Sequence, residues 1–202
     1  MKLTWLGHAC FVLEQDGYAI LLDPYTGVEG YPPLEAAAHQ VFCSHQHFDH
    51  NAVEVVRMLP ARESPFTARE IPAFHDGQGG ALRGENTIRV FSAEGIAVAH
   101  LGDLGHQLSP EQIAAVGPVD LVMVPVGGTY TVDAAGAKRV CEALSPKWAV
   151  PMHYRHTPYG LPNVGGVEDF LSLWGPEQVH RLEGPSLELP LPSPGVWVPE
   201  FV

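Results

Sequence analysis

The first fifth of the chain alternates between short apolar runs and turn-forming residues. Strands are expected over residues 3–6, 10–14 and 18–22, and the Asp16-Gly17 pair between the last two is a strong hairpin signal. The third strand should stop at Asp23-Pro24, because proline donates no backbone N–H to a sheet. The chain is therefore predicted to begin as an antiparallel meander that holds Asp23 at a strand end.

The next apolar run leads directly into a polar segment. A strand is expected over residues 39–44, followed at once by residues 45–50, which are rich in histidine. Val53, Val56 and Leu59 then recur at helical spacing, so a helix is predicted over residues 51–59. This pattern predicts that the polar segment forms a strand-to-helix turn.

Strands and helices alternate in the remainder of the sequence. The helix after Ser109 has the clearest start, because an N-cap serine is followed by proline and by a glutamine three residues later. The predicted strands cover residues 87–91, 96–101, 119–126 and 148–152, and the predicted helices cover residues 109–116, 133–144 and 167–174.

This order of elements predicts an α/β (α+β) fold in which two mixed sheets face each other with helices outside, a four-layer αβ/βα sandwich. Neither an internal repeat nor a linker interrupts the sequence, so residues 1–202 are expected to form one domain. Asp23, Asp103 and His153 all follow predicted strands. Loops at strand ends gather into sites, and one edge of the sandwich is expected to collect these side chains.

Charge narrows the range of partners. Among 202 residues, 11 Lys and Arg stand against 23 Asp and Glu, which gives a formal net charge of −12. Such a field repels phosphate backbones, so a nucleic-acid partner is not expected. Bound divalent cations reverse the sign locally, and a small anionic substrate stays compatible with the sequence.

The cysteines and the hydropathy pattern indicate the compartment. Three cysteines in apolar surroundings, Cys10, Cys43 and Cys141, are typical of packing residues rather than of a disulfide framework. The sequence contains neither a secretory leader nor an apolar run of about eighteen residues. We therefore expect a cytoplasmic protein without a membrane segment.

Histidine is the most unusual feature of the composition, since 11 residues are roughly double the average usage. Four metal-ligand residues occur within six positions, in His45-Gln46-His47-Phe48-Asp49-His50. An extended backbone places side chains 45 and 47 on the same face, where both imidazoles can meet one ion. A histidine-rich surface loop is the alternative, but this spacing favours a metal site for zinc, manganese or iron.

These residues resemble the metallo-β-lactamase superfamily, whose signature is His-x-His-x-Asp-His with one Asp upstream and His, Asp and His downstream. The outlying positions correspond here to Asp23, His75, Asp103 and His153. Within the superfamily, two segments resemble the branch that contains ascorbate-phosphate lactonase and N-acylphosphatidylethanolamine phospholipase D. They are Gly7-His8-Ala9-Cys10-Phe11 and Asp103-Leu104-Gly105-His106.

The resemblance implies a dinuclear hydrolase that uses a metal-bound hydroxide on a small ester, lactone or phosphodiester. Zn²⁺ is the expected ion, with Mn²⁺ or Fe²⁺ as alternatives. Asp23 is expected to orient a ligand histidine instead of binding metal, and the branch resemblance is compatible with a homo-oligomer. The implied ligands are His45, His47 and His75 for one ion, Asp49, His50 and His153 for the other, and Asp103 as the bridge, with Asp49 and Asp103 in the catalytic group.

Several roles stay open at this level. His75 competes with His100 as a ligand, and strand alternation counted back from Asp103 favours His75, since it makes His100 a packed core residue. His8 and His106 are candidates for proton transfer to the leaving group, or are structural histidines.

Other residues are candidates for substrate contact. Tyr154 and Arg155 follow the last ligand and are expected to border the pocket, where Arg155 is either an anion clamp or a surface arginine. The glycine-rich stretch 79–84 lacks the ending of a P-loop and is expected to be a turn.

Two other classes of function fit the same residues. Iron-dependent redox enzymes share the resembled fold, although a flavin partner domain does not fit in this length. A metal-stabilised binding module is the other alternative, but structural zinc sites are usually closed by cysteine ligands. Ligands drawn only from histidine and aspartate leave open positions and favour catalysis. RNA processing in the superfamily usually requires an extra domain, which is not expected here.

Overall fold

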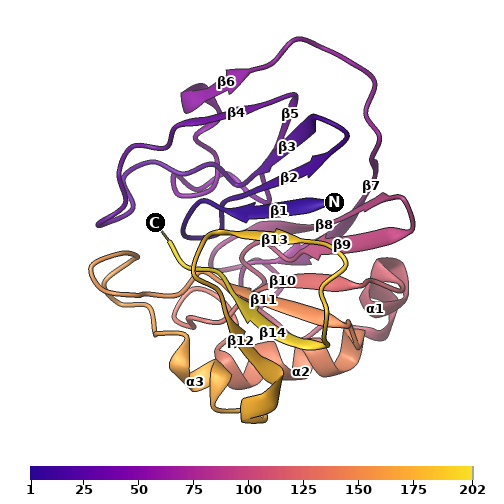
Figure 1. Cartoon of the computed structure of the whole chain (residues 1–202). Coiled ribbons are helices and arrows are strands. Elements are labelled where there is room, and N and C mark those ends of the chain that lie inside the picture. The colour runs from indigo at the N-terminus through magenta and orange to yellow at the C-terminus, as the bar shows by residue number, and fades with distance from the viewer. Residues whose placement is uncertain (202) are drawn as a thin grey trace.

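Two β-sheets that face each other form the centre of the computed structural model, which describes residues 1–201 (Figure 1). The predicted αβ/βα sandwich is confirmed at this level. In spatial order, the smaller sheet consists of β13 (Ser186–Glu188), β1 (Lys2–Trp5), β2 (Phe11–Gln15), β3 (Tyr18–Leu22) and β5 (Gln40–Phe42). The larger sheet consists of β12 (Val179–Arg181), β14 (Gly195–Val198), β11 (Trp148–Met152), β10 (Leu121–Pro125), β9 (Ile96–His100), β8 (Glu85–Ala93) and β7 (Thr67–Phe74).

Both sheets are mixed, as the sequence predicted. The first three strands form the expected meander, and its hairpin turns at Asp16 and Gly17, which have positive φ values of 51° and 72°. In the larger sheet β7, β8 and β9 are antiparallel, whereas β9, β10, β11, β14 and β12 run parallel. The β10 strand is buried at every position, which explains its unbroken apolar sequence.

The helices α1 (Pro110–Val116), α2 (Ala134–Leu144) and α3 (Glu168–Leu171) lie beside the larger sheet (Figure 1). The predicted capping box is present, because Ser109 Oγ accepts from the Gln112 N–H while Gln112 Oε1 accepts from the Ser109 N–H. Asp133 caps α2 through a single bond, because its Oδ1 accepts from the Gly136 N–H. The third helix is shorter than the predicted 167–174.

The helix predicted over residues 51–59 is wrong. The structure has a 3₁₀ turn, η1 (Val53–Val55), and then β6 (Val56–Met58), which pairs in parallel with β4 (Ala36–Ala38). Of the positions with helical spacing only Val56 is buried, so this segment has no continuous apolar face that a helix would bury. The outer layer over the smaller sheet is consequently this two-stranded ribbon instead of a helix (Figure 1).

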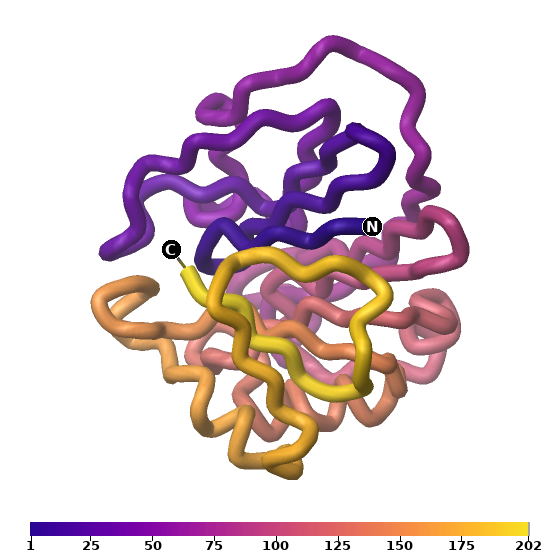
Figure 2. The backbone as a smooth tube through the Cα atoms, in the orientation of Figure 1, coloured from indigo at the N-terminus to yellow at the C-terminus, as the bar shows by residue number. Residues whose placement is uncertain are grey.

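Two parts of the sheets, the β7 strand and the C-terminal strands, were not predicted from the sequence. The β7 strand lies at the sheet edge, where Pro72 is tolerated and the charged side chains Arg69 and Glu70 face solvent. The C-terminal segment also enters the sheets: β14 inserts between β12 and β11, and β13 pairs with β1. Figure 2 shows this segment in yellow returning to the indigo N-terminal strand.

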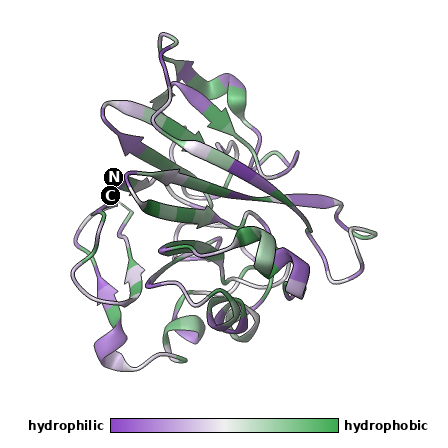
Figure 3. Cartoon of the chain, turned by 90° about the vertical axis from the view of Figure 1, so that its right-hand side faces the viewer, coloured by the Kyte–Doolittle hydropathy of each residue, from purple (hydrophilic) through white to green (hydrophobic). Residues whose placement is uncertain are grey.

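One apolar cluster fills the space between the sheets and beneath the helices, and Figure 3 shows hydrophobic residues concentrated along the central strands. Leu13, Phe91 and Val150 from different strands are fully buried in it.

Cys10 and Cys141 are buried free thiols, as expected of packing residues, and Cys43 is half-buried. Within residues 1–201 no helix has the length and apolar character needed to cross a bilayer.

Asp120 links three strands of the larger sheet. Its Oδ2 accepts from the Ala97 N–H at 2.9 Å, its Oδ1 accepts from Lys147 Nζ at 2.8 Å, and its carbonyl accepts from the Trp148 N–H. Partial burial opposes ionisation, but the Lys147 ammonium and the Ala97 N–H together lower the pKa of Asp120 below its ordinary value. The carboxylate is therefore stabilised in the folded state.

Asp120→Asn is expected to lower the free energy of unfolding at pH 7 by about 1 kcal/mol. Because the folded pKa is depressed, this contribution is complete above the unfolded value near 4 and is lost as the pH falls through the folded value. Urea denaturation of both proteins at pH 7 and pH 3 should thus show a difference that shrinks in acid. An equal difference at both pH values would contradict this reading.

Candidate metal centre

The strand ends that carry histidine and aspartate converge at one edge of the sandwich. Asp23 follows β3, residues 45–50 follow β5, His75 follows β7, Asp103 follows β9 and His153 follows β11. The segment 45–50 itself consists of bends and turns and is not followed by the predicted helix.

Three of the convergent residues have left-handed backbone conformations, with φ values of 52° for His8, 46° for Asp23 and 53° for His153. Such conformations are uncommon outside glycine and cost of order 1–3 kcal/mol each, and they gather at functional sites. The surrounding packing therefore holds these side chains in place.

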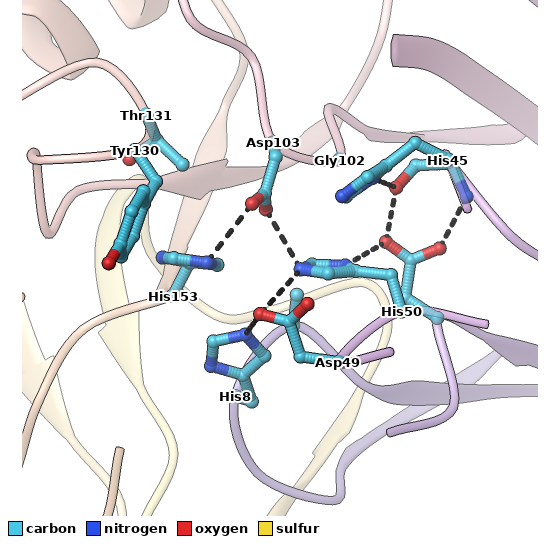
Figure 4. Close-up of polar contacts among 12 residues, drawn as sticks. His8, His45, Asp49, His50, Gly102, Asp103, Tyr130, Thr131 and His153 are labelled. Carbon is cyan, nitrogen blue, oxygen red and sulfur yellow. Dashed lines mark hydrogen bonds and ion pairs between the residues drawn. The ribbon is translucent and has the colours of Figure 1, made fainter. Parts of the chain in front are cut away.

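Besides the group of Asp23, His45 and His50, two groups of side chains bring possible ligand atoms within 4.8 Å of one another, and Asp103 contacts imidazoles of both. Its Oδ2 is 3.1 Å from His153 Nε2 and its Oδ1 is 3.2 Å from His50 Nε2 (Figure 4). The same Oδ2 is 3.2 Å from His75 Nε2. The first group consists of His45, His47 and His75, and the second of His8, Asp49, His50 and His153.

The facing atoms of this cluster approach one another without forming regular hydrogen bonds. Among residues 1–201, His45 Nε2, His50 Nε2, His153 Nε2 and Asp103 Oδ1 are buried without a hydrogen bond. A buried polar atom left unpaired costs about 1–3 kcal/mol, which a cation between the lone pairs would offset. Imidazole and carboxylate without thiolate are donors that suit zinc, manganese and iron. The residues present thus fit a bound metal.

Asp23 organises the back of the cluster. Its Oδ2 accepts from His50 Nδ1 at 2.8 Å and from Ser44 Oγ at 2.6 Å, and the same Ser44 Oγ accepts from His45 Nδ1 at 2.9 Å. With Nδ1 occupied, each imidazole directs its Nε2 lone pair into the cluster. Asp23 is also close enough to His45 and His50 to count as a donor itself, but its oxygens are already taken up by these hydrogen bonds.

Two groups that orient candidate ligand histidines were not predicted from the sequence. Ser44 directly precedes the histidine cluster, so its position was a usable signal. The other is a backbone carbonyl: His75 Nδ1 donates to Tyr130 O at 3.0 Å. A carbonyl oxygen has no counterpart in a residue pattern, and this contact between segments 55 positions apart was not predictable.

A cavity of about 310 Å³ opens directly over the cluster. Its floor consists of ligand candidates, and the remaining lining comes from aromatic, aliphatic and cationic side chains. The lining residues are His47, Asp49, His75 and Asp103 at the floor, with Phe48, Arg83, Tyr130 and Leu161 around them.

The two residues predicted to contact substrate, Tyr154 and Arg155, lie outside the lining of this cavity. Tyr154 is 2% exposed and stacks on Trp5 at 5.6 Å between ring centroids, so packing explains it. Arg155 points to Glu29, with 3.6 Å between NH2 and Oε1. Neither lines the cavity, and the arginine that does is Arg83.

The comparisons with known proteins agree with this geometry. Residues 2–153 match the family model described as the β-lactamase superfamily domain. This chain belongs to the metallo-β-lactamase superfamily. The UPF0173 metal-dependent hydrolase of Archaeoglobus fulgidus is 32% identical over 197 residues, which covers 78% of this chain and 85% of the relative, and places the chain in that family. The corresponding protein of Carboxydothermus hydrogenoformans is 29% identical and covers 84% and 91%.

A solved structure supports the same assignment. A Thermotoga maritima protein, a candidate zinc-dependent hydrolase of the metallo-β-lactamase superfamily, is 37% identical, covers 98% of this chain and 97% of its own, and superposes with a TM-score of 0.77. The relatives described here carry the name of metal-dependent hydrolases and not that of the lactonase or phospholipase branch.

Burial favours the neutral form of the histidines in this superfamily member. It lowers the pKa of His45 to about 3 and that of His8 to about 4, in both cases with help from a neighbouring histidine. Burial opposes ionisation of Asp103, but His153 and His50 hold its pKa well below the ordinary range. Burial also opposes protonation of His50 and His75, but Asp103 raises the pKa of both imidazoles, and Asp23 adds to this effect at His50. A divalent cation binds neutral imidazole and ionised carboxylate, so its binding would release protons from these two histidines.

The two histidines considered for proton transfer differ in placement. His8 is 1% exposed, and its Nε2 lies 3.2 Å from Asp49 Oδ2, inside the cluster. His106 uses both ring nitrogens on backbone groups, since Nε2 accepts from the Phe74 N–H and Nδ1 donates to Gln107 O. It therefore ties two loops together, and its two bonds favour the structural role over proton transfer.

His100 lies apart from the cavity lining. Its Nε2 donates to Ala9 O at 3.0 Å and its Nδ1 accepts from the Gly102 N–H at 3.2 Å. These bonds account for its burial, and it is His75 whose ring faces Asp103.

Proposed function

We propose that this chain is a dinuclear metal-dependent hydrolase that acts on a small ester, lactone or phosphodiester. The observation that carries the proposal is the position of Asp103, which lies within 3.2 Å of imidazoles from both ligand groups. A single carboxylate shared in this way suits two neighbouring ions better than one.

The ligand assignment follows from the two groups. His45, His47 and His75 would hold one ion, Asp49, His50 and His153 the other, and Asp103 would bridge them. Divalent ions there would supply Lewis acidity, which lowers the pKa of water toward 7 and neutralises charge that develops on a substrate oxygen. Zn²⁺ is the ion we expect, with Mn²⁺ and Fe²⁺ as alternatives.

The chain's own residues would position these groups. Asp23 and Ser44 fix the rings of His45 and His50, and the Tyr130 carbonyl fixes His75. We assign His8 a positioning role, because its contact with Asp49 orients that carboxylate from behind the cavity. The small cavity volume limits the substrate to a small molecule.

Metal analysis of the purified protein, combined with hydrolysis of bis(p-nitrophenyl) phosphate and of a simple lactone, tests this proposal. We expect about two metal ions per chain, activity that a chelator removes, and recovery when zinc or manganese is restored. Protein that stays metal-free and inactive after zinc or manganese is added would overturn the hydrolase and favour a binding module. Iron with dioxygen uptake and without hydrolysis would favour the redox alternative.

A further inference from the structure

The loop between β7 and β8 is built around the carboxylate of Asp76. This side chain is 3% exposed and accepts four backbone N–H bonds of 2.7–3.0 Å, from Gln78, Gly80, Leu82 and Arg83. Removal from water would raise its pKa, but the four donors lower the pKa to about 2. Asp76 is thus ionised at neutral pH and fixes the backbone that presents Arg83.

The side chain of Arg83 is held in place as well. Its NH2 donates to Thr129 O at 3.1 Å, and its guanidinium carbon lies 5.6 Å from the centre of the Tyr130 ring. The Tyr130 hydroxyl in turn accepts from Asn163 Nδ2 at 2.6 Å. The residue that supports the guanidinium is therefore the same residue whose carbonyl orients His75.

The guanidinium of Arg83 forms no ion pair in the part of the chain that the structure describes. Across the described chain, residues 1–201, no carboxylate oxygen lies within 4.0 Å of it, although the protein as a whole is acidic. A guanidinium has five N–H donors, and the contact with Thr129 accounts for one of them. Arg83 is also the only Lys or Arg in the cavity lining. The cavity thus has one fixed cation with free donors.

The remaining lining is apolar. Phe48 is 57% exposed and Leu161 is half-buried, and both apolar side chains border the cavity. A molecule whose reacting bond lies at the histidine and aspartate floor would meet these side chains and Arg83 together. Arginine binds carboxylate and phosphate through paired N–H donors, whereas a neutral substrate would leave the guanidinium unpaired.

We propose that Arg83 binds an oxyanion group of the substrate, a carboxylate or phosphate separate from the bond that is hydrolysed, while an apolar part packs on Phe48 and Leu161. The inference rests on the proposed hydrolase activity and adds the substrate class: a small amphiphilic anion. Arg83 is a specificity-determining residue in this scheme, and its loss should affect anionic substrates selectively.

Two esters of equal chain length test the proposal in zinc-loaded protein: 4-nitrophenyl hydrogen adipate, which ends in a carboxylate, and the neutral 4-nitrophenyl hexanoate. Arg83→Gln should lower kcat/KM for the adipate ester about 10- to 100-fold and change it little for the hexanoate ester. Arg83→Lys should recover part of the loss, because lysine keeps the positive charge but lacks the paired N–H donors of a guanidinium. Arg69→Gln is the matched control, since Arg69 also bonds a backbone carbonyl, that of Val116, but lies outside the cavity.

Calorimetric titration with adipate gives a second readout that needs no turnover. Its dissociation constant should rise about 10-fold or more in Arg83→Gln and stay unchanged in Arg69→Gln. Equal loss on both esters, or equal adipate affinity in wild type and Arg83→Gln, would overturn the role of Arg83 while the hydrolase stands. Adipate binding that depends on Arg83, in wild type that cleaves neither ester nor any phosphodiester or lactone, would support the anion site and count against the hydrolase.

Discussion

Replacing Asp103 by alanine is expected to abolish hydrolysis, with a fall in kcat/KM of about three orders of magnitude or more. The carboxylate contacts His50, His75 and His153 and so reaches imidazoles of both ligand sets. Its removal would leave two divalent ions without the shared negative charge that holds them together, and metal Lewis acidity is worth several kcal/mol in such reactions.

The measurement pairs kinetics with metal content. Asp103→Ala should bind fewer than the wild-type number of ions and show no recovery when zinc is supplied in excess. Asp120→Asn is the matched control, because it changes another carboxylate next to a strand of the same sheet without touching the cluster. Wild-type turnover in Asp103→Ala would show that the bridge is not needed and would contradict the dinuclear assignment.

The second large effect is expected from Gly105→Ala, although Gly105 has no side chain that could bind metal or substrate. A β-carbon at this position would overlap the backbone of His75 and Asp76, and those atoms cannot rotate away. The Gly105 N–H also donates to Phe74 O, which keeps the two loops in contact. We expect kcat/KM to fall about 100-fold, because ligand displacements near 1 Å have effects of this size, and stability to fall by about 1–3 kcal/mol.

Gly184→Ala is the control for this change, since a β-carbon there meets no atom within 4 Å. Thermal unfolding and kcat/KM should both stay near wild type in the control and fall together in Gly105→Ala. Loss of stability without loss of activity would mean that the loops separate without moving His75.

The sequence predicted those features that depend on neighbouring residues. The Asp16-Gly17 turn, the Ser109 cap and the buried β10 strand are local signals, and all of them agree with the structure. The histidine cluster was found for the same reason, because its members are contiguous.

Features that depend on contacts between distant segments could not be predicted from the sequence. The segment after the cluster has helical spacing, but tertiary pairing with β4 makes it a strand. The β7 strand was hidden by Pro72 and its exposed charges, which only an edge position tolerates. Arg83 was passed over because its importance depends on a loop folded around Asp76, whereas Arg155 is merely adjacent to a ligand in sequence.

The insertion of β14 between β12 and β11 has a consequence for biosynthesis. The β11 strand, which ends just before His153, pairs on one side with β14. Trp148 therefore cannot pair on that side until Gly195 has been synthesised. Until residue 198 has left the ribosome, β12 has no partner and the open edge of β11 is exposed to aggregation. The nascent chain is therefore expected to complete this half of the sheet only after β14 has been synthesised.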